Sequence, residues 1–213
     1  MVLVGLVLIA IGTAVGYLIP RGSGIDESIA TFAIDQREAW LTRAFRVITA
    51  SGSTAFLLPF AIVVAVVLVV RERTTRPAVF ITVAGAGVLL LYQSIKVAVS
   101  RPRPELEPII AVATGYAFPS GHAAQSVALL GAIATALTHR APRRWQIAAA
   151  VTVIVWAALI GASRVYLGVH WTSDVIGGWT LGAVWLLVVT RCLCSGASSR
   201  SGVPVEARTR APC

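Results

Sequence analysis

The chain has 213 residues, of which 57% are hydrophobic and only 13% are charged, whereas soluble domains carry about 25% charged residues. This balance argues against a soluble helical protein, because the short polar connections would leave too little polar surface to keep such apolar helices in water. The net charge of +9 comes almost entirely from arginine, but the arginines flank apolar segments, which argues against nucleic-acid binding.

Six apolar stretches predict an all-α, polytopic membrane protein with six transmembrane helices. A bilayer crossing takes about 20 residues, so the last three stretches need a few flanking residues to span it. The first stretch has no basic residue before Arg21 and no clear small-residue cleavage site, which favours a retained helix over a signal peptide. The stretches are Val2 to Ile19, Thr54 to Val70, Ala78 to Val99, His122 to Leu137, Ile147 to Ala162 and Val175 to Thr190.

The connection between the first two stretches contains the sequence "ESIATFAIDQREAWLTRAFRVI". Its apolar residues Ile34, Leu41, Phe45 and Ile48 recur at roughly helical spacing, opposite charged residues. This pattern predicts an amphipathic helix that lies on the outer membrane surface, with a mobile polar loop as the alternative.

The distribution of arginine predicts the orientation in the membrane. Cytoplasmic connections are enriched in Lys and Arg, which places two basic loops, the C-terminal tail and the N-terminus in the cytoplasm. The remaining connections, Pro20 to Ser53, Ser100 to Gly121 and Ser163 to Asp174, then face outward. The basic residues are Arg71, Arg73 and Arg76 in one loop, Arg140, Arg143 and Arg144 in the other, and Arg191, Arg200, Arg208 and Arg210 in the tail.

Few ionisable residues lie near the apolar segments away from these basic loops, and all of them fall at the predicted outer side. Charges near a bilayer are costly and are usually functional. Because the fourth helix runs inward from His122 and the fifth runs outward to Ser163, His122 and His170 return to one face. The residues are Lys96, Arg101, Arg103, His122, Arg164, His170 and Asp174.

The stretch "KVAVSRPRP" places Lys96 near a helix end, followed by two arginines. These side chains could anchor the helix at the interface, as long basic side chains often do. Alternatively, Pro102 and Pro104 stiffen the backbone and hold a guanidinium in a defined direction, and arginine is well shaped for bidentate phosphate recognition.

The stretch "PSGH" can be an ordinary helix start with Ser120 as the N-cap. A helix N-terminus also offers unpaired N–H groups to an anion, so Ser120 and Gly121 could supply N–H and hydroxyl donors. His122 could be a surface histidine, but beside a bound phosphate it could act as a proton donor.

The stretch "SRVYLGVHWTSD" contributes Arg164 and a His170–Asp174 pair spaced four residues apart, which would share one face of a helix. A carboxylate on one imidazole nitrogen leaves the other nitrogen free to attack. Zinc binding is the competing interpretation, but a third ligand at helical spacing is missing and Glu105 and Glu107 lie in a Pro-rich loop.

Taken together, "KVAVSRPRP", "PSGH" and "SRVYLGVHWTSD" resemble, in order and spacing, the three signature motifs of the type 2 phosphatidic acid phosphatase superfamily. The resemblance implies that His170 is the nucleophile, that Asp174 orients it and that His122 protonates the leaving oxygen. It further implies that phosphate is bound by five residues and that no metal or cofactor is needed; Arg101 receives no catalytic role. The five residues are Lys96, Arg103, Ser120, Gly121 and Arg164.

The expected function is therefore a membrane lipid phosphatase acting through a phosphohistidine intermediate, with a lipid phosphate rather than a nucleic acid as partner. Undecaprenyl-type polyprenyl diphosphate, phosphatidic acid and phosphatidylglycerol phosphate all remain open as substrates, because the motifs recognise only phosphate. The alternatives are a vanadium haloperoxidase, a phosphatase of soluble sugar phosphates, and a non-enzymatic phospholipid-binding or transport protein.

The sequence predicts one membrane domain over residues 1–194 and a disordered cytoplasmic tail over residues 195–213, which is rich in Ser, Gly, Arg and Pro. The cysteines Cys192, Cys194 and Cys213 are interpreted as incidental, because their cytoplasmic position disfavours disulfides. The oligomeric state is left open.

Overall fold

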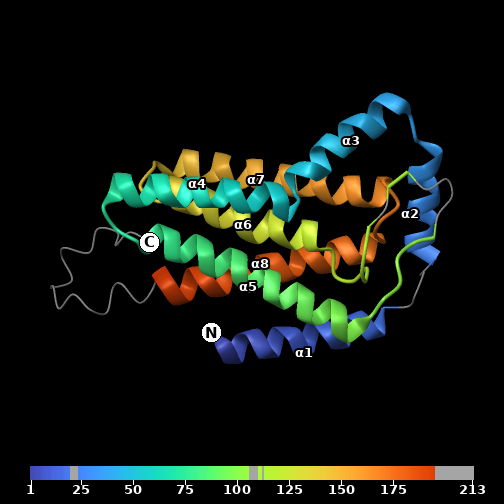
Figure 1. Cartoon of the computed structure of the whole chain (residues 1–213), viewed down its shortest axis with the longest axis horizontal. Coiled ribbons are helices and arrows are strands. Elements are labelled where there is room, and N and C mark those ends of the chain that lie inside the picture. Colours follow the sequence, from blue (N-terminus) through green and yellow to red (C-terminus); the bar gives the residue numbers. More distant parts are fainter. Residues whose placement is uncertain (20–23, 106–109, 112, 195–213) are drawn as a thin grey trace.

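A computed structural model describes residues 1–19, 24–105, 110–111 and 113–194. Within these ranges the chain is all-helical, as predicted, and each of the six apolar stretches forms a helix (Figure 1). The predicted disordered tail, residues 195–213, lies outside the described residues. The helices are α1 (Val2–Leu18), α2 (Gly24–Asp35), α3 (Ala39–Ser51), α4 (Thr54–Glu72), α5 (Arg76–Val99), α6 (Gly121–Thr138), α7 (Arg143–Tyr166) and α8 (Thr172–Cys194).

The amphipathic stretch between α1 and α4 forms two helices, α2 and α3, instead of the single helix that its spacing predicts. At the break, Glu38 is extended, with φ −119° and ψ 148°. The side chain of Arg37 donates to the carbonyl of Tyr166 at 3.2 Å, and the Glu38 N–H donates to the Tyr166 hydroxyl at 3.1 Å. Contacts with the end of α7 therefore accompany the interruption, and helical periodicity alone could not reveal them.

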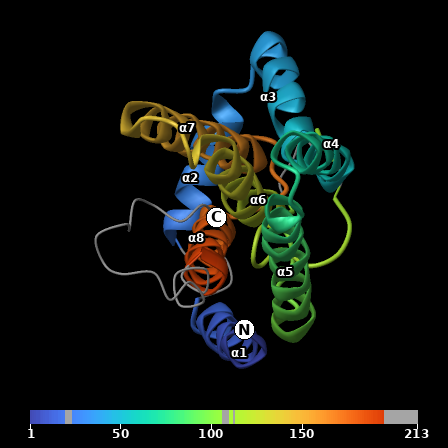
Figure 2. The ribbon, with the colours of Figure 1, turned by 90° about the vertical axis from the view of Figure 1, so that its left-hand side faces the viewer.

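The long helices run along one axis, and α6 lies in the middle of the bundle between α4, α5, α7 and α8 (Figure 2). On α8, a Cβ added at Gly178 or Gly182 would come within 2.5 Å of the backbone oxygen of Ser120 or Ala124 in α6. Glycine at these two positions allows the close helix contact that is typical of membrane bundles. This contact brings the start of α6 against the start of α8.

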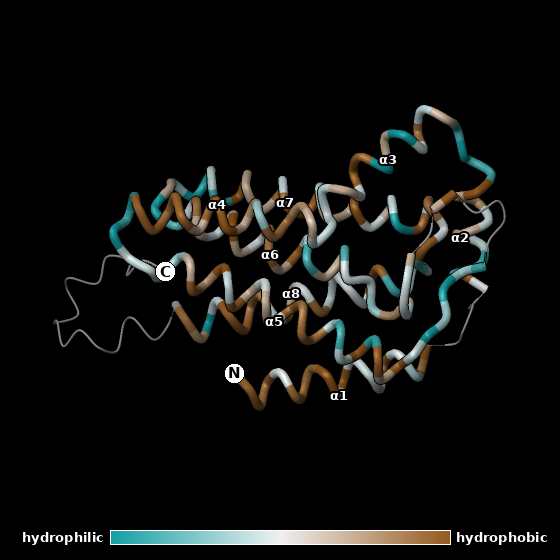
Figure 3. The backbone as a smooth tube through the Cα atoms, viewed as in Figure 1, coloured by the Kyte–Doolittle hydropathy of each residue, from teal (hydrophilic) through white to brown (hydrophobic). Residues whose placement is uncertain are grey.

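By length and composition, four helices are candidate membrane spans: α4, α5, α7 and α8. Helix α1 is apolar but shorter, with 17 residues. Helix α6 carries the polar residues His122, Gln125 and Ser126 near its start and buries much of its surface within the bundle. Figure 3 shows apolar residues along the length of the bundle and polar residues gathered at its two ends.

The two ends of the bundle differ in what they hold (Figure 1). One end carries the α4–α5 and α6–α7 turns with the arginine-rich loops. The other end carries α2, the α5–α6 connection and the α7–α8 connection. All three phosphatase-like stretches therefore meet at the second end, as predicted.

Candidate active site

The eight predicted site residues come from five parts of the fold. Lys96 lies in the last turn of α5 and Arg103 in the connection that follows, while Arg164 lies in the last turn of α7. Ser120 is the N-cap of α6, and Gly121 and His122 begin that helix. His170 precedes α8 and Asp174 lies in its first turn.

The pair of His170 and Asp174 forms across the start of α8. The two residues do not share a helical face as the spacing predicts, because α8 begins only at Thr172. His170 Nδ1 lies 3.4 Å from Asp174 Oδ2, and the backbone N–H of Trp171 donates to the same oxygen at 2.8 Å. Both side chains of the pair are buried. The carboxylate is thus held in place by the turn that also carries the histidine.

The other nitrogen of His170 faces Arg103, at 3.2 Å from Nη1 to Nε2. A guanidinium can only donate hydrogen bonds, so Nε2 must accept and the ring proton must sit on Nδ1, toward Asp174. In this tautomer Nε2 carries no proton and its lone pair accepts from Arg103, so the nitrogen could attack phosphorus once that bond is released.

Arg103 is held by three backbone carbonyls. Its Nε donates to Gly115 at 2.9 Å, its Nη2 to Thr114 at 2.9 Å and its Nη1 to Val169 at 2.6 Å. Neutral carbonyls fix the direction of the guanidinium without cancelling its charge. The charge stays available for an anion.

The surroundings of His170 determine its protonation state. Burial lowers the pKa of His170 well below its ordinary value, and the charges of Lys96, Arg164, Arg103 and His122 lower it further. The imidazole is therefore neutral at neutral pH and able to act as a nucleophile. His122, half-buried at the first turn of α6, belongs to the same cluster.

The remaining two cations are likewise held by neutral groups. Lys96 Nζ donates to the carbonyls of Tyr116 at 2.5 Å and Ala117 at 3.2 Å. Arg164 Nη1 donates to the hydroxyl of Thr49 at 2.9 Å, and within the described part of the chain its buried Nε has no hydrogen-bond partner. Thr49 belongs to α3, so the amphipathic segment contributes a contact that sequence reasoning missed.

Ser120 caps α6 without the usual side-chain bond. Its N–H donates to the carbonyl of Asp174 at 2.9 Å, so the predicted N–H donor of Ser120 is already used. Its hydroxyl, however, is fully buried and has no partner among the described residues, although an N-cap hydroxyl normally accepts from the first turn of its helix. The buried hydroxyl is a donor without an acceptor, as an anion site requires.

Gly121 has a steric reason to be glycine. An added Cβ would lie 2.9 Å from the ring of Tyr92 in α5. The first N–H groups of α6 have no partner within the helix and could donate to an anion, while the absence of a side chain at Gly121 makes room for the ring of Tyr92.

The structure also gathers residues that motif reasoning did not assign. Arg101 is buried and contacts Asp174, and Asp26 of α2 and Ser173 of α8 complete this group. Asp26 lies in the connection between the first two apolar stretches, where acidic and basic residues are equal in number, and nothing in the sequence distinguishes it from Glu27.

The fold is that of a multi-pass helical membrane phosphatase. The family model of the PAP2 superfamily matches residues 76–194, and the chain belongs to this superfamily. Among its relatives, it is 32% identical over 166 residues to phosphatidylglycerophosphatase B of Bacillus subtilis (strain 168), covering 77% of this chain and 81% of that protein. It is 31% identical over 154 residues to undecaprenyl-diphosphatase of Sulfolobus acidocaldarius, covering 66% and 69%.

Solved structures give the same result for the fold. The crystal structure of a transmembrane PAP2-type phosphatidylglycerolphosphate phosphatase from Bacillus subtilis matches with a TM-score of 0.80 and 25% identity, covering 95% of this chain and 98% of that one. Aquifex aeolicus LpxE matches with a TM-score of 0.64 and 24% identity, covering 82% and 99%, which is a likeness of fold alone.

Proposed function

We propose that the protein is a membrane lipid phosphatase that transfers phosphate from a lipid to His170 and then to water. The observation that carries the proposal is the unprotonated Nε2 of His170 facing Arg103, beside buried donors that lack partners in the described ranges. Relatives named as phosphatidylglycerophosphatase and undecaprenyl-diphosphatase support the same reaction class.

Lys96, Arg103 and Arg164 would hold the phosphate oxygens, together with the Ser120 hydroxyl and the N–H groups at Gly121. Such a set of fixed donors stabilises the charge spread over the oxygens of a phosphoryl-transfer transition state. The donors are oriented by carbonyls and by Thr49, and the Arg103 N–H that faces His170 Nε2 would turn to the phosphate before that nitrogen attacks.

In the first step, His170 Nε2 attacks phosphorus and the bond from phosphorus to the lipid oxygen breaks. His122 donates a proton to the leaving oxygen, and Asp174 stabilises the imidazole that now carries phosphate. In the second step, water attacks the phosphohistidine and gives its proton to His122. The nitrogen–phosphorus bond breaks, which releases inorganic phosphate and restores His170.

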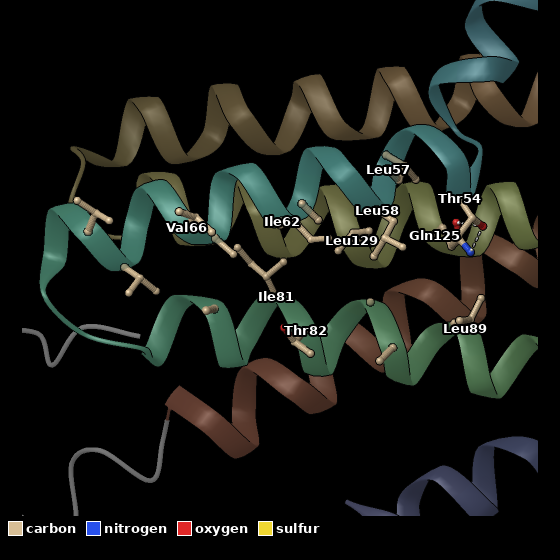
Figure 4. A pocket seen from close by; sticks show the side chains of 17 residues that line it. Thr54, Leu57, Leu58, Ile62, Val66, Ile81, Thr82, Leu89, Gln125 and Leu129 are labelled. Carbon is tan, nitrogen blue, oxygen red and sulfur yellow. Dashed lines mark hydrogen bonds between the residues drawn. The ribbon is translucent and has the colours of Figure 1, made fainter.

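An apolar groove of about 480 Å³ between α4 and α5 suits the lipid chain of the substrate (Figure 4). Apolar side chains such as Leu58, Ile62 and Leu89 line it, and the polar pair Thr54 and Gln125 lies at one end. Gln125 donates to the hydroxyl of Tyr92 at 2.8 Å, and the ring of Tyr92 lies against Gly121. The groove thus leads from the bundle surface toward the start of α6.

The membrane arrangement follows from the same proposal. A single domain over residues 1–194 would cross the membrane six times, with α1 and α6 joining the four candidate spans. The site would face the outside, α2 and α3 would lie at the outer surface, and both termini would be cytoplasmic.

An impermeant thiol reagent tests this orientation in intact cells, in a background with the native cysteines replaced by serine. A cysteine at Glu105, exposed at the site end, should be labelled from outside. A cysteine at Thr75, exposed at the opposite end, should be labelled only after lysis. The reverse pattern would overturn the orientation.

Phosphate release in detergent, without added metal, tests the function. The panel contains phosphatidylglycerol phosphate, phosphatidic acid, a polyprenyl diphosphate and a soluble sugar phosphate. Wild-type protein should release phosphate from at least one lipid, and His170→Ala should not. His139→Ala, which changes a histidine at the end of α6 opposite His122, is the matched control and should stay active. Equal release by wild type and His170→Ala would exclude the proposal.

A further inference from the structure

Arg101 is buried between two carboxylates, one on each side of its guanidinium. Its Nη1 lies 2.7 Å from Asp174 Oδ1, and its Nη2 lies 3.1 Å from Asp26 Oδ2. The side chains of Arg101 and Asp26 are 2% exposed and that of Asp174 is 0% exposed. An arginine that only anchored a helix at the membrane surface would keep its charge in water, so the structure contradicts that interpretation for Arg101.

Asp26 also forms hydrogen bonds with the first turn of α8. The backbone N–H of Ser173 donates to Asp26 Oδ1 at 2.9 Å, and the Ser173 hydroxyl donates to Asp26 Oδ2 at 2.6 Å. Arg101 Nη1 donates in turn to the Ser173 hydroxyl at 2.7 Å. Asp26 therefore caps α8 from another helix, at an N–H that the helix itself leaves without a partner.

The two carboxylate oxygens of Asp174 have different partners. Oδ1 accepts from Arg101, whereas Oδ2 accepts from the Trp171 N–H and faces His170 Nδ1. Rotation of the carboxylate would break the bond to Arg101. The guanidinium therefore keeps Oδ2 directed at His170, and Asp26 keeps the guanidinium in place.

The environment of Asp26 fits this arrangement. Burial alone would raise the pKa of Asp26, but the bonds from Ser173 and the bond and charge of Arg101 outweigh it, so that the pKa lies below its ordinary value. Asp26 is thus ionised at neutral pH and pairs with Arg101 as a charge.

We propose that Arg101 and Asp26 are positioning residues of the phosphatase reaction, which act through Asp174 and make the docking of α2 a condition for full activity. This inference rests on the proposed function. Neither residue touches the phosphate; they set the orientation of the carboxylate that orients the nucleophile. The outer helix α2 is then part of the catalytic apparatus as well as a cover for the bundle end.

The first test is Asp26→Asn, with Glu27→Gln as the matched control on the next, exposed residue of the same helix. Steady-state kinetics are measured on the lipid phosphate that wild type hydrolyses best. Loss of the partner that orients a metal-ligating side chain costs about 10- to 100-fold in activity, and we expect a similar factor for the carboxylate that orients His170. Asp26→Asn should lower kcat by that factor and change KM by less than about 2-fold, because the phosphate-binding donors are intact. Glu27→Gln should change neither.

The second test is a double-mutant cycle with Asp174→Asn. If Asp26 acts through Asp174, then Asp26→Asn should cost no further kcat in the Asp174→Asn background. The same fold loss in both backgrounds, or an effect on KM alone, would overturn the inference. So would an unchanged kcat in Asp26→Asn while wild type remains active. Absence of wild-type hydrolysis across the whole panel is a different result, because it removes the proposed function itself.

Arg101→Met extends the test but removes a buried charge, so its folding is checked by thermal unfolding in detergent. The double variant Arg101→Met/Asp26→Leu removes both charges together but does not restore the hydrogen bond to Asp174. A wild-type kcat in this variant would therefore contradict a positioning role. A kcat that stays low in the folded double variant agrees with the inference.

Discussion

Two kinds of cation lie at the same end of the bundle. Arg101 is paired with two buried carboxylates, Asp26 and Asp174. Lys96, Arg103 and Arg164 instead donate to carbonyls and to a hydroxyl, and none of them has a carboxylate within ion-pair distance in the part of the chain that the structure describes. The paired cation can hold structure, whereas the others retain charge for a ligand.

The difference has an energetic side. Burial and mutual repulsion disfavour the charges of the second group, while a paired guanidinium is compensated by its neighbours. The three cations therefore repel one another in the absence of a ligand, and a bound phosphate would offset this repulsion. Substitutions in the two groups should consequently change activity and stability in different combinations.

Among substitutions of these cations, the largest effect on activity is expected for Arg164→Met. Removing one donor to a transition state costs about 10²- to 10³-fold in rate, so kcat/KM for the lipid substrate should fall by this factor. The unfolding temperature in detergent should stay equal or rise, because a buried charge that repels Lys96 and Arg103 is gone. Arg43→Met, at an exposed arginine of α3, should change neither quantity. A clear drop in unfolding temperature would show that Arg164 is mainly structural.

Arg101→Met should affect stability more than Arg164→Met does, and activity less. It leaves Asp26 and Asp174 as buried carboxylates without their shared arginine, and breaking such a pair costs about 3–5 kcal/mol in the free energy of unfolding. Denaturation in detergent should detect this loss, while kcat falls less than in Arg164→Met. Equal stability of Arg101→Met and wild type would contradict the division into two kinds of cation.

The division explains what the sequence could and could not predict. The six apolar stretches and the three motifs were sufficient to predict an all-helical membrane fold and the end at which Lys96, His122 and His170 meet. Hydropathy is a local property of each stretch, and the direction of each helix follows from the order of the stretches, so both can be predicted from the sequence. The phosphate-binding roles remain predictions that the variants above can test.

The pairing of Arg101 with Asp26 could not be predicted, because it joins residues 75 positions apart through a helix whose orientation depends on tertiary contacts. The break between α2 and α3 was missed for the same reason: Arg37 and Glu38 are held by Tyr166, which is distant in sequence. The spacing of His170 and Asp174 correctly predicted their contact but not its position, since α8 begins between them.

A smaller effect is expected from Ser120→Ala. The Ser120 hydroxyl has no partner among the residues that the structure describes, so its removal should leave the unfolding temperature unchanged. A lost hydrogen bond to a charged ligand is worth about 1.5–3 kcal/mol, so kcat/KM should fall by about 10- to 100-fold. Ser126→Ala is the control: it is equally buried on α6, but its hydroxyl donates to the carbonyl of Ala123 at 2.9 Å. A Ser120→Ala variant with full activity would remove Ser120 from the phosphate site.

The smallest effect is a shift in the acid limb of the pH profile. His170 must be neutral to attack, and its pKa lies below the ordinary value because of burial and the charges of Lys96, Arg164, Arg103 and His122, with Asp174 as the facing carboxylate. Protonation therefore begins to abolish kcat/KM of the free enzyme only below about pH 6.5. Lys96→Met removes one positive neighbour, which makes the imidazolium less unfavourable and raises the pKa of His170. The acid limb of the residual activity should then move to higher pH than in wild type. Ionisation of the substrate is common to both proteins and cancels in the comparison, so a limb that stays in place or moves to lower pH would separate Lys96 from the cluster that keeps His170 neutral.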